Sequence, residues 1–509
     1  MRKLYNLFIN ELIKNVKKIS VLVMLIIMVV CVLGIGSIIK FSEYMNKRSL
    51  EMNNSSSTQK SDYWKDQIKN EITNMENQLS LNSQQSGEII YSESPEIIKI
   101  RIEMYKKALE KDINVFSTSY KAQAINSIIN YKTELLTLSA IPLPEKNTTD
   151  RKTLLEGFIV DLNKAIDNSS IADYVKVKNE EVKASNISDE EKQIEYDVNA
   201  LRIKYNIAGN QDMNGSDSAE FMLDSIKSLK TSLLNNIDYT IGTIKPLTPQ
   251  NRIEAENKLA VNLYKLDKSI SDTTTTVFGI DTAVSGMMGV GIFIMIILLI
   301  ILGGSAISQE ISTGSIKSII ISPAKRWKIF LSKVLAIFTI GVFAAIILYI
   351  VTMLFSGLLF GFKSGQPYIY AVNGMAHGLN FYLYKFIYLF INFTEVIIFM
   401  IFALMLSTVT RNTAASVGIS MAVYFGGNVA VTFIAFFFKG EWVKFIPFVN
   451  FGIADRLFAS STLNQASMGS AGMNNILQIP VIFSVFYLAV LFICLFYTAL
   501  DSFNRREIK

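Results

Sequence analysis

Long apolar runs alternate with polar stretches along this chain, and they predict most of its architecture. Six runs of about 20 residues are almost entirely apolar, the length that a helix needs to cross a hydrocarbon core about 30 Å thick. Because backbone polar groups cannot stay unpaired in lipid, each run is predicted to be a helix. The runs comprise residues 19–39, 287–307, 335–360, 381–406, 414–438 and 481–500, and the last four fall within residues 331–509.

A long polar region, residues 40–286, separates the first two runs. It is rich in Asn, Ser, Lys and Glu and poor in Pro and Gly, and apolar residues such as Ile98, Met104 and Leu109 recur in it at helical spacing. The region is therefore predicted to be a separate, mainly helical domain. Breaks between its helices are expected near residues 83–87, 142–149 and 209–216.

Two local signals in this region predict where helices begin. Ser188 followed by Glu191 matches a capping box, in which the two side chains satisfy each other's backbone N–H groups. Thr248 followed by Pro249 matches an N-cap and the first helical position. Helices are therefore expected from about residues 189 and 249.

Residues 1–18 have the pattern of an amphipathic helix lying at a membrane surface, because their lysines fall away from the apolar face. The alternative for these residues is a charged leader to a signal anchor, and the first run itself could be mistaken for a cleaved signal peptide. The following run is longer than a typical signal core and no A-x-A-like site follows it, so an uncleaved span is expected. The apolar face comprises Leu4, Leu7, Phe8, Leu12, Val16 and Ile19.

Composition and charge agree with a multi-pass membrane protein and predict its orientation. Half of the 509 residues are hydrophobic and the mean hydropathy is +0.33, which excludes an ordinary soluble domain. Lys and Arg concentrate before the first run, after the second, at Arg411 and near the C-terminus. By the positive-inside rule both termini are predicted to be cytoplasmic and residues 40–286 extracellular. The net charge of +6 reflects this inside excess, so no nucleic-acid partner is expected.

The sequence offers very little catalytic chemistry. His377 is the only histidine, in a short predicted outer loop, and a structural or solvated role is expected for it. Cys31 and Cys494 both fall inside predicted spans, and there is no HExxH or CxxC. The chain also lacks a Gly-Lys dipeptide, which rules out a phosphate-binding GxxxxGK[ST] loop. No catalytic residue, cofactor or metal is predicted, so energy for any transport would come from a partner or an ion gradient.

The polar segment 308–330, between the second and third runs, carries a motif. Glu310-Ile-Ser-Thr-Gly314-Ser315 is followed by apolar residues and then by Ser322-Pro323-Ala-Lys325-Arg326. This resembles the coupling helix of type-2 ABC transporter permeases, which contacts a cytoplasmic ATP-binding subunit. The alternative is an ordinary interfacial hairpin with positive charges. The resemblance implies docking by Glu310, Gly314, Ser315, Lys317, Pro323, Lys325 and Arg326.

Two further segments resemble the same family. Residues 1–18 are similar to its N-terminal elbow helix, and residues 439–477, with Pro447 in an apolar stretch, are similar to its short re-entrant outer helices. The resemblance implies a permease subunit of an ATP-driven exporter in a bacterial cell membrane. It would pair with a second permease copy and an ATP-binding subunit that holds the ATP. Related permeases with large outer domains imply an amphipathic substrate such as an antimicrobial peptide or drug.

Polar residues inside the predicted spans are the remaining candidates. Glu395 and Asn392 lie in the fourth span and Asn428 in the fifth. A carboxylate at that depth costs at least a few kcal/mol, so it should face protein or water. Two readings stay open: these residues line a translocation path or a dimer seam, or neighbouring helices hold them structurally.

A second class of function competes with transport. The same six spans and long helical outer domain suit a non-transport scaffold or receptor, such as a secretion-system component. The coupling segment separates the two readings, because a scaffold has no need of it. A secondary transporter is the third candidate, and the lack of inverted repeats and of several membrane carboxylates counts against it.

Overall fold

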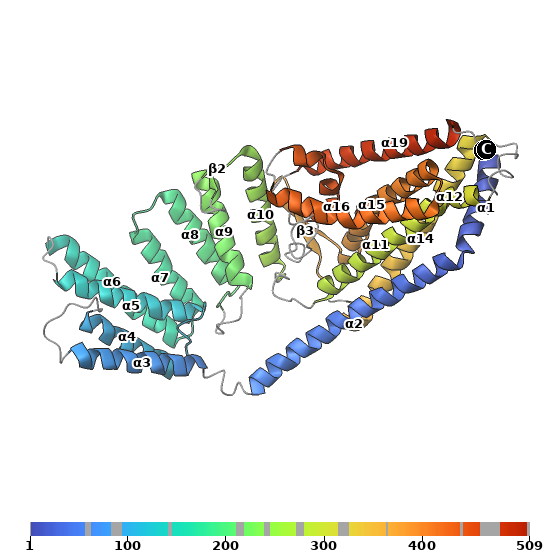
Figure 1. Ribbon diagram of the computed structural model, residues 1–509. Helices are drawn as coiled ribbons and strands as arrows, with labels where there is room; N and C mark the ends of the chain where they lie inside the picture. Colours follow the sequence, from blue (N-terminus) through green and yellow to red (C-terminus); the bar gives the residue numbers. More distant parts are fainter. Residues whose placement is uncertain are drawn as a thin grey trace. The chain divides into compact units, whose positions relative to one another are not determined.

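The computed structural model of the protein is a helical chain that divides into two compact units (Figure 1). The first, called the membrane unit, comprises residues 1–45, 276–368 and 379–509; the second, called the polar unit, comprises residues 46–275 and 369–378. The structure describes residues 2–55, 63–82, 94–140, 145–209, 218–238, 245–270, 279–313, 325–362, 365–437, 441–458 and 479–505.

The membrane unit is built from long apolar helices. Within the described residues, five of them are long and apolar enough to cross a membrane, as expected for an all-α membrane protein. Its helices are α1 (Arg2–Val16), α2 (Ile19–Ser55, which continues past residue 45 into the polar unit), α11 (Ile280–Ser305), α12 (Ser308–Ser312), α14 (Arg326–Phe360), α15 (Phe381–Thr410), α16 (Thr413–Phe437), α17 (Ile453–Leu457) and α19 (Val481–Arg505), with 3-10 helices η2 (Glu441–Phe445) and η3 (Pro447–Asn450).

The sixth predicted span corresponds to α16. It is helical over 25 residues, but among the described side chains only its part from Thr413 to Gly427 counts as an apolar helix, and that part is too short to cross a bilayer. The five helices that qualify are α2, α11 with α12, α14, α15 and α19. A sixth crossing therefore stays a prediction.

Helix α11 is the centre of the membrane unit because its neighbours surround it. Side chains on its successive turns are buried, and it packs against α14, α15 and α16. Two of its glycines permit a close approach of α15 and α16: a Cβ at Gly303 would lie 2.7 Å from the backbone oxygen of Met400, and one at Gly304 would lie 2.7 Å from the Val417 side chain. Such contacts are typical of membrane helices that pack backbone to backbone.

Helix α1 carries the predicted apolar face only in part. Leu4, Leu7, Phe8 and Leu12 are half-buried, and Leu7 and Leu12 pack against the core of the membrane unit. Val16 remains exposed, and α1 packs on α14. The helix therefore uses its first three turns for packing, and the chain turns at residues 17–18 before α2 begins.

The polar unit is a set of amphipathic helices around two apolar clusters. The larger cluster draws buried residues such as Ile125, Leu155 and Val175 from α3 to α7, and the smaller one draws Leu223 and Leu266 from α9 and α10. These helices are α3 (Tyr63–Asn82), α4 (Pro95–Glu110), α5 (Tyr120–Ala140), α6 (Glu145–Asp167), α7 (Ile171–Ala184), α8 (Asp189–Lys204), α9 (Ser218–Asn235) and α10 (Pro249–Asp267).

The predicted helix starts in the polar unit are confirmed. The Ser188 side chain accepts from the backbone N–H of Glu191, whose carboxylate accepts from the Ser188 N–H in return. Thr248 accepts from the Asn251 N–H at 3.2 Å. The expected break near residues 142–149 is shorter than predicted, because α6 already begins at Glu145.

Strands were not expected, and the described part of the chain contains two short pairs of them. One is β1 (Ile237–Asp238) with β2 (Lys245–Pro246), and the other is β3 (Tyr368–Val372) with β4 (Met375–Leu379). The second pair replaces a predicted outer loop. Asn373 and Gly374 join its strands with φ of 52° and 75°, as a tight hairpin turn requires. His377 is exposed on β4, beside the ring of Tyr370.

The β3–β4 hairpin contacts the last helix of the polar unit. The Gly374 N–H donates to the Asn257 side-chain oxygen of α10 at 2.9 Å. The tip of a connection between two membrane helices is thus fixed to the polar unit.

Candidate functional site

The motif-bearing segment begins with a buried charge cluster. Glu310, on the short helix α12, is 4% exposed, and Lys333 of α14 is 2% exposed. Lys333 Nζ lies 2.7 Å from Glu310 Oε1 and 2.8 Å from Glu11 Oε1 of α1. Lys14 Nζ, also of α1, donates to the same Glu310 oxygen. These four residues, called the basal charge cluster, join α1, α12 and α14.

Opposite charges alternate in the basal charge cluster, and this alternation permits their burial. A single buried charge would cost several kcal/mol, whereas each carboxylate here faces an ammonium group. Burial acts to lower the pKa of Lys14, but the hydrogen bond and charge of Glu310 outweigh it and raise that pKa. Burial lowers the pKa of the neighbouring Lys18, and the charges of Lys14 and Lys333 add to this effect. A small polar cavity of about 140 Å³ lies among these side chains.

A hydroxyl group holds the start of α12 from another side. Ser407 Oγ of α15 accepts from the backbone N–H of Ser308 at 2.9 Å and from that of Ile307 at 3.3 Å. Ser308 Oγ in turn lies 2.9 Å from Thr413 Oγ1 at the start of α16. Because the first N–H groups of a helix have no internal partners, these bonds fix the position of α12.

The predicted docking residues differ in their exposure, and some of them are not described by the structure. The side chain of Glu310 points into the protein toward lysines, so it does not present a carboxylate at the surface. Lys325 is exposed at the N-cap of α14, and Arg326 Nη1 donates to the Asn504 carbonyl of α19 at 3.0 Å. Gly314, Ser315, Lys317 and Pro323 lie outside the described residues. Docking by this set stays a prediction.

The polar residues of the spans are only partly described. Glu395 and Asn392 are half-buried on α15. The backbone of Asn428 belongs to α16, and its side chain lies outside the described part of the chain. A role of these residues in a translocation path or a dimer seam stays a prediction.

A second buried ion pair was not predicted from the sequence. It involves Lys385, near the start of α15 and at the opposite end of that helix from Ser407. Lys385 is 2% exposed; its Nζ lies 2.6 Å from Asp281 Oδ1 of α11 and 3.0 Å from Ser285 Oγ. The ammonium group also lies over the Tyr384 ring, 4.8 Å from its centroid. The available signal was a lysine inside an apolar run, and Lys333 near the start of α14 gave the same signal.

Aromatic and polar contacts continue from Lys385 into the segment before α19. Tyr388 Oη donates to Asp455 Oδ1 at 2.7 Å, and Arg456 donates to Ser484 Oγ at 2.8 Å and to the Asn450 carbonyl at 3.0 Å. The predicted re-entrant segment therefore contains η2, η3 and α17 in its described part, held by buried polar bonds. Residues 459–478 lie outside that part.

Neither charge cluster combines the side chains of a metal site. Within the described ranges, no group of three or more His, Cys, Asp or Glu side chains could hold a metal ion. Both clusters combine ammonium groups with carboxylates on different helices. Their arrangement can transmit a displacement between helices.

Comparison with known proteins identifies relatives of this architecture. A family model described as "ABC-2 family transporter protein" matches residues 5–508. The uncharacterized protein YhcI of Bacillus subtilis (strain 168) is 26% identical over 264 residues, covering 49% of this chain and 75% of that protein. The uncharacterized membrane protein YdbK of the same organism is 27% identical over 154 residues, covering 30% of this chain and 58% of YdbK. The family match confirms the resemblance found in the sequence motif.

Proposed function

This chain belongs to the ABC-2 transporter family, and from that premise we propose that it couples ATP hydrolysis by a separate subunit to export. The family supplies a non-catalytic membrane subunit of a transporter, which agrees with the absence of a phosphate-binding loop from the sequence. In the proposal, an ATP-binding subunit docks on residues 308–330 from the cytoplasm, and a second permease copy completes the path.

The basal charge cluster is the observation that carries this proposal. The docking segment starts at α12, and Glu310 on that helix is bonded to α14 through Lys333 and to α1 through Lys14. Ser407 ties the same short helix to α15. A push on the segment would therefore move three helices of the membrane unit together. A scaffold would gain nothing from such a connection.

The proposed orientation follows from charge. Both termini and residues 308–330 would be cytoplasmic, and residues 40–286 would lie outside the bacterial cell. The basic residues near the start of α14 and the end of α19 support this arrangement, since they are brought together by the bond from Arg326 to Asn504.

The proposed substrate is an amphipathic molecule such as an antimicrobial peptide or a drug. The support for this choice is the resemblance of the chain to permeases that also have a large domain outside the membrane. The described residues of the polar unit show stable helices with apolar cores, which suit a receptor or a partner-holding surface as well.

Co-purification tests the central step of the proposal. Full-length protein isolated gently from its host membrane should bring down an ATP-binding subunit in stoichiometric amount. Glu310→Lys should lower ATP-dependent transport, because it places a third ammonium group beside Lys14 and Lys333. Gly314→Trp should reduce subunit binding. If no ATPase co-purifies and both variants keep full function, the scaffold reading replaces the exporter.

A further inference from the structure

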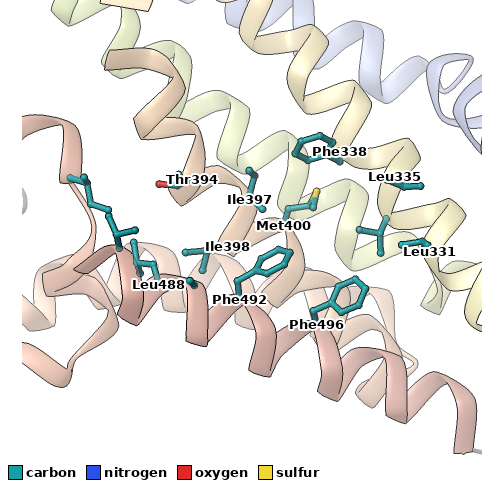
Figure 2. A pocket seen from close by; sticks show the side chains of 14 residues that line it. Leu331, Leu335, Phe338, Thr394, Ile397, Ile398, Met400, Leu488, Phe492 and Phe496 are labelled. Carbon is teal, nitrogen blue, oxygen red and sulfur yellow. The ribbon is translucent and has the colours of Figure 1, made fainter. Parts of the chain in front are cut away.

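An apolar groove runs along the membrane unit between α14, α15 and α19 (Figure 2). Its volume is about 550 Å³, and the rings of Phe338, Phe492 and Phe496 lie along it. Leu331 and Leu335 of α14 and Ile398 of α15 complete its apolar walls. All three helices are long and apolar enough to cross a membrane, so we expect the groove to face the hydrocarbon core.

Among the described residues that line the groove, no side chain offers a free polar group to a ligand. Thr394 supplies the one side-chain hydroxyl of its lining, and that hydroxyl donates to the Ile391 carbonyl at 2.7 Å. Water would find no hydrogen-bond partner there, and an apolar surface of this kind is favourably covered by hydrocarbon. An occupant must therefore be a hydrocarbon chain or an apolar side chain.

One end of the groove is basic and aromatic. Arg326 joins the start of α14 to the end of α19 through its bond to the Asn504 carbonyl. Lys325 and Lys328 flank it, and Trp327 is 43% exposed beside the Lys328 ammonium group. Leu331, where the groove begins, lies five residues after Arg326, about 7.5 Å along the helix.

Among the described residues, the carboxylates nearest this end each pair with a lysine or an arginine. Asp501 pairs with Arg505 at 2.6 Å on α19. Glu11 and Glu310 pair with Lys333. An anionic partner for Lys325 and Lys328 can come from the phosphate groups of the surrounding bilayer, which lie near the ends of membrane-spanning helices.

We propose that the groove binds an anionic phospholipid, with its phosphate at Lys325 and Lys328 and one acyl chain beside Phe492 and Phe496. The lysines match the position of a lipid's phosphate, the exposed Trp327 indole matches its interfacial region, and the apolar walls of the groove match its acyl chain. This lipid is distinct from the exported substrate, and the inference does not rest on the proposed transport activity.

Native mass spectrometry of the full-length protein in micelles containing phosphatidylglycerol or phosphatidylcholine tests the site. We expect one phosphatidylglycerol to be retained in preference to phosphatidylcholine. Ala489→Phe places a ring in the groove and should abolish that retention. The matched control is Ile493→Phe, on the same helix at a position 63% exposed and outside the groove, which should retain the lipid.

A charge variant tests the headgroup separately from the groove. Lys328→Gln should lower the preference for phosphatidylglycerol about fivefold, the effect of one cation near an anionic surface, and Lys328→Arg should restore it. Equal retention of both lipids by the unaltered protein would overturn the proposal. So would unchanged lipid binding by Ala489→Phe, or a loss of dimer mass in that variant without loss of lipid, which would identify a second copy as the occupant.

Discussion

The two units of the protein each bury an ion pair, and the pairs differ in how many helices share them. In the polar unit, both terminal nitrogens of Arg202 on α8 meet both carboxylate oxygens of Glu220 on α9. That pair is closed, because each partner satisfies the other. In the membrane unit, one oxygen of Glu310 accepts from two lysines on two different helices.

The two arrangements of ion pairs predict different roles, one in local stability and the other in coupled movement of helices. A closed pair between neighbouring helices fixes local packing, and its loss should be felt only there. The shared carboxylate of Glu310 links α12 to α14 and also to α1, which lies 296 positions away at Lys14. A change at one of these residues therefore alters the electrostatic surroundings of the others. We therefore expect the first pair to matter mainly for folding of the polar unit and the second mainly for movement of the membrane unit.

The largest effect is expected from breaking the closed pair. Glu220→Ala would leave the Arg202 guanidinium buried without its carboxylate, at a cost of about 3–5 kcal/mol in the free energy of unfolding of the polar unit. Hydrogen exchange of α8 and α9 in the full chain measures it. Glu76→Ala, which removes an exposed pair with Lys106, should change little. Equal effects of the two variants would contradict the contrast between closed and exposed pairs.

A somewhat smaller effect is expected in the basal charge cluster. A double-mutant cycle of Glu310→Gln and Lys333→Gln should give a coupling energy of about 1–3 kcal/mol in denaturant unfolding of the membrane unit. Transport should fall in both single variants even where unfolding is little changed. Lys333→Arg keeps the charge and should retain part of the activity. A coupling energy near zero would mean that the two side chains act independently.

Removing the cap of α8 tests whether the polar unit responds locally. Ser188→Ala deletes the hydroxyl that accepts from the Glu191 N–H and should cost about 1 kcal/mol. Hydrogen exchange should rise in the first turn of α8, with transport unchanged. Faster exchange throughout the membrane unit would show that the two units are more strongly linked than their ion pairs indicate.

The smallest effect is expected at Lys14, whose side chain is 49% exposed although it shares Glu310. Lys14→Gln should change stability by no more than about 1 kcal/mol. Because its pKa is raised in the folded protein, the stabilisation from Lys14 is present below its unfolded pKa of about 10.4 and is lost as pH rises through the folded value. An alkaline titration of unfolding, compared between the protein and Lys14→Gln, measures this loss. Identical titrations would remove Lys14 from the cluster.

Local sequence signals predicted most helices of the fold, but they could not predict contacts between residues far apart in the sequence. Run length alone predicts a membrane helix, and the capping residues at Ser188 and Thr248 act within four residues of themselves, so both could be found in the sequence. Lys333 pairs with Glu11 across 322 positions, and no periodicity encodes such a partner. The family motif includes Glu310 but not the lysines that pair with it.

The β3–β4 hairpin was missed for a different reason. The Asn373-Gly374 pair is a strong hairpin signal, and it lay in a stretch interpreted as a loop between two membrane helices. Its strands are short and only half-covered, so hydrophobic alternation was weak.

The β3–β4 hairpin also determines how the chain can be divided into exchangeable domains. Because residues 369–378 belong to the polar unit, the chain passes between the two units after residues 45, 275, 368 and 378. An exchange of residues 46–275 with a relative would therefore separate Asn257 from the Gly374 N–H that it accepts. Chimeras and truncations that exchange or remove the polar unit must therefore change two discontinuous pieces of sequence, residues 46–275 and 369–378.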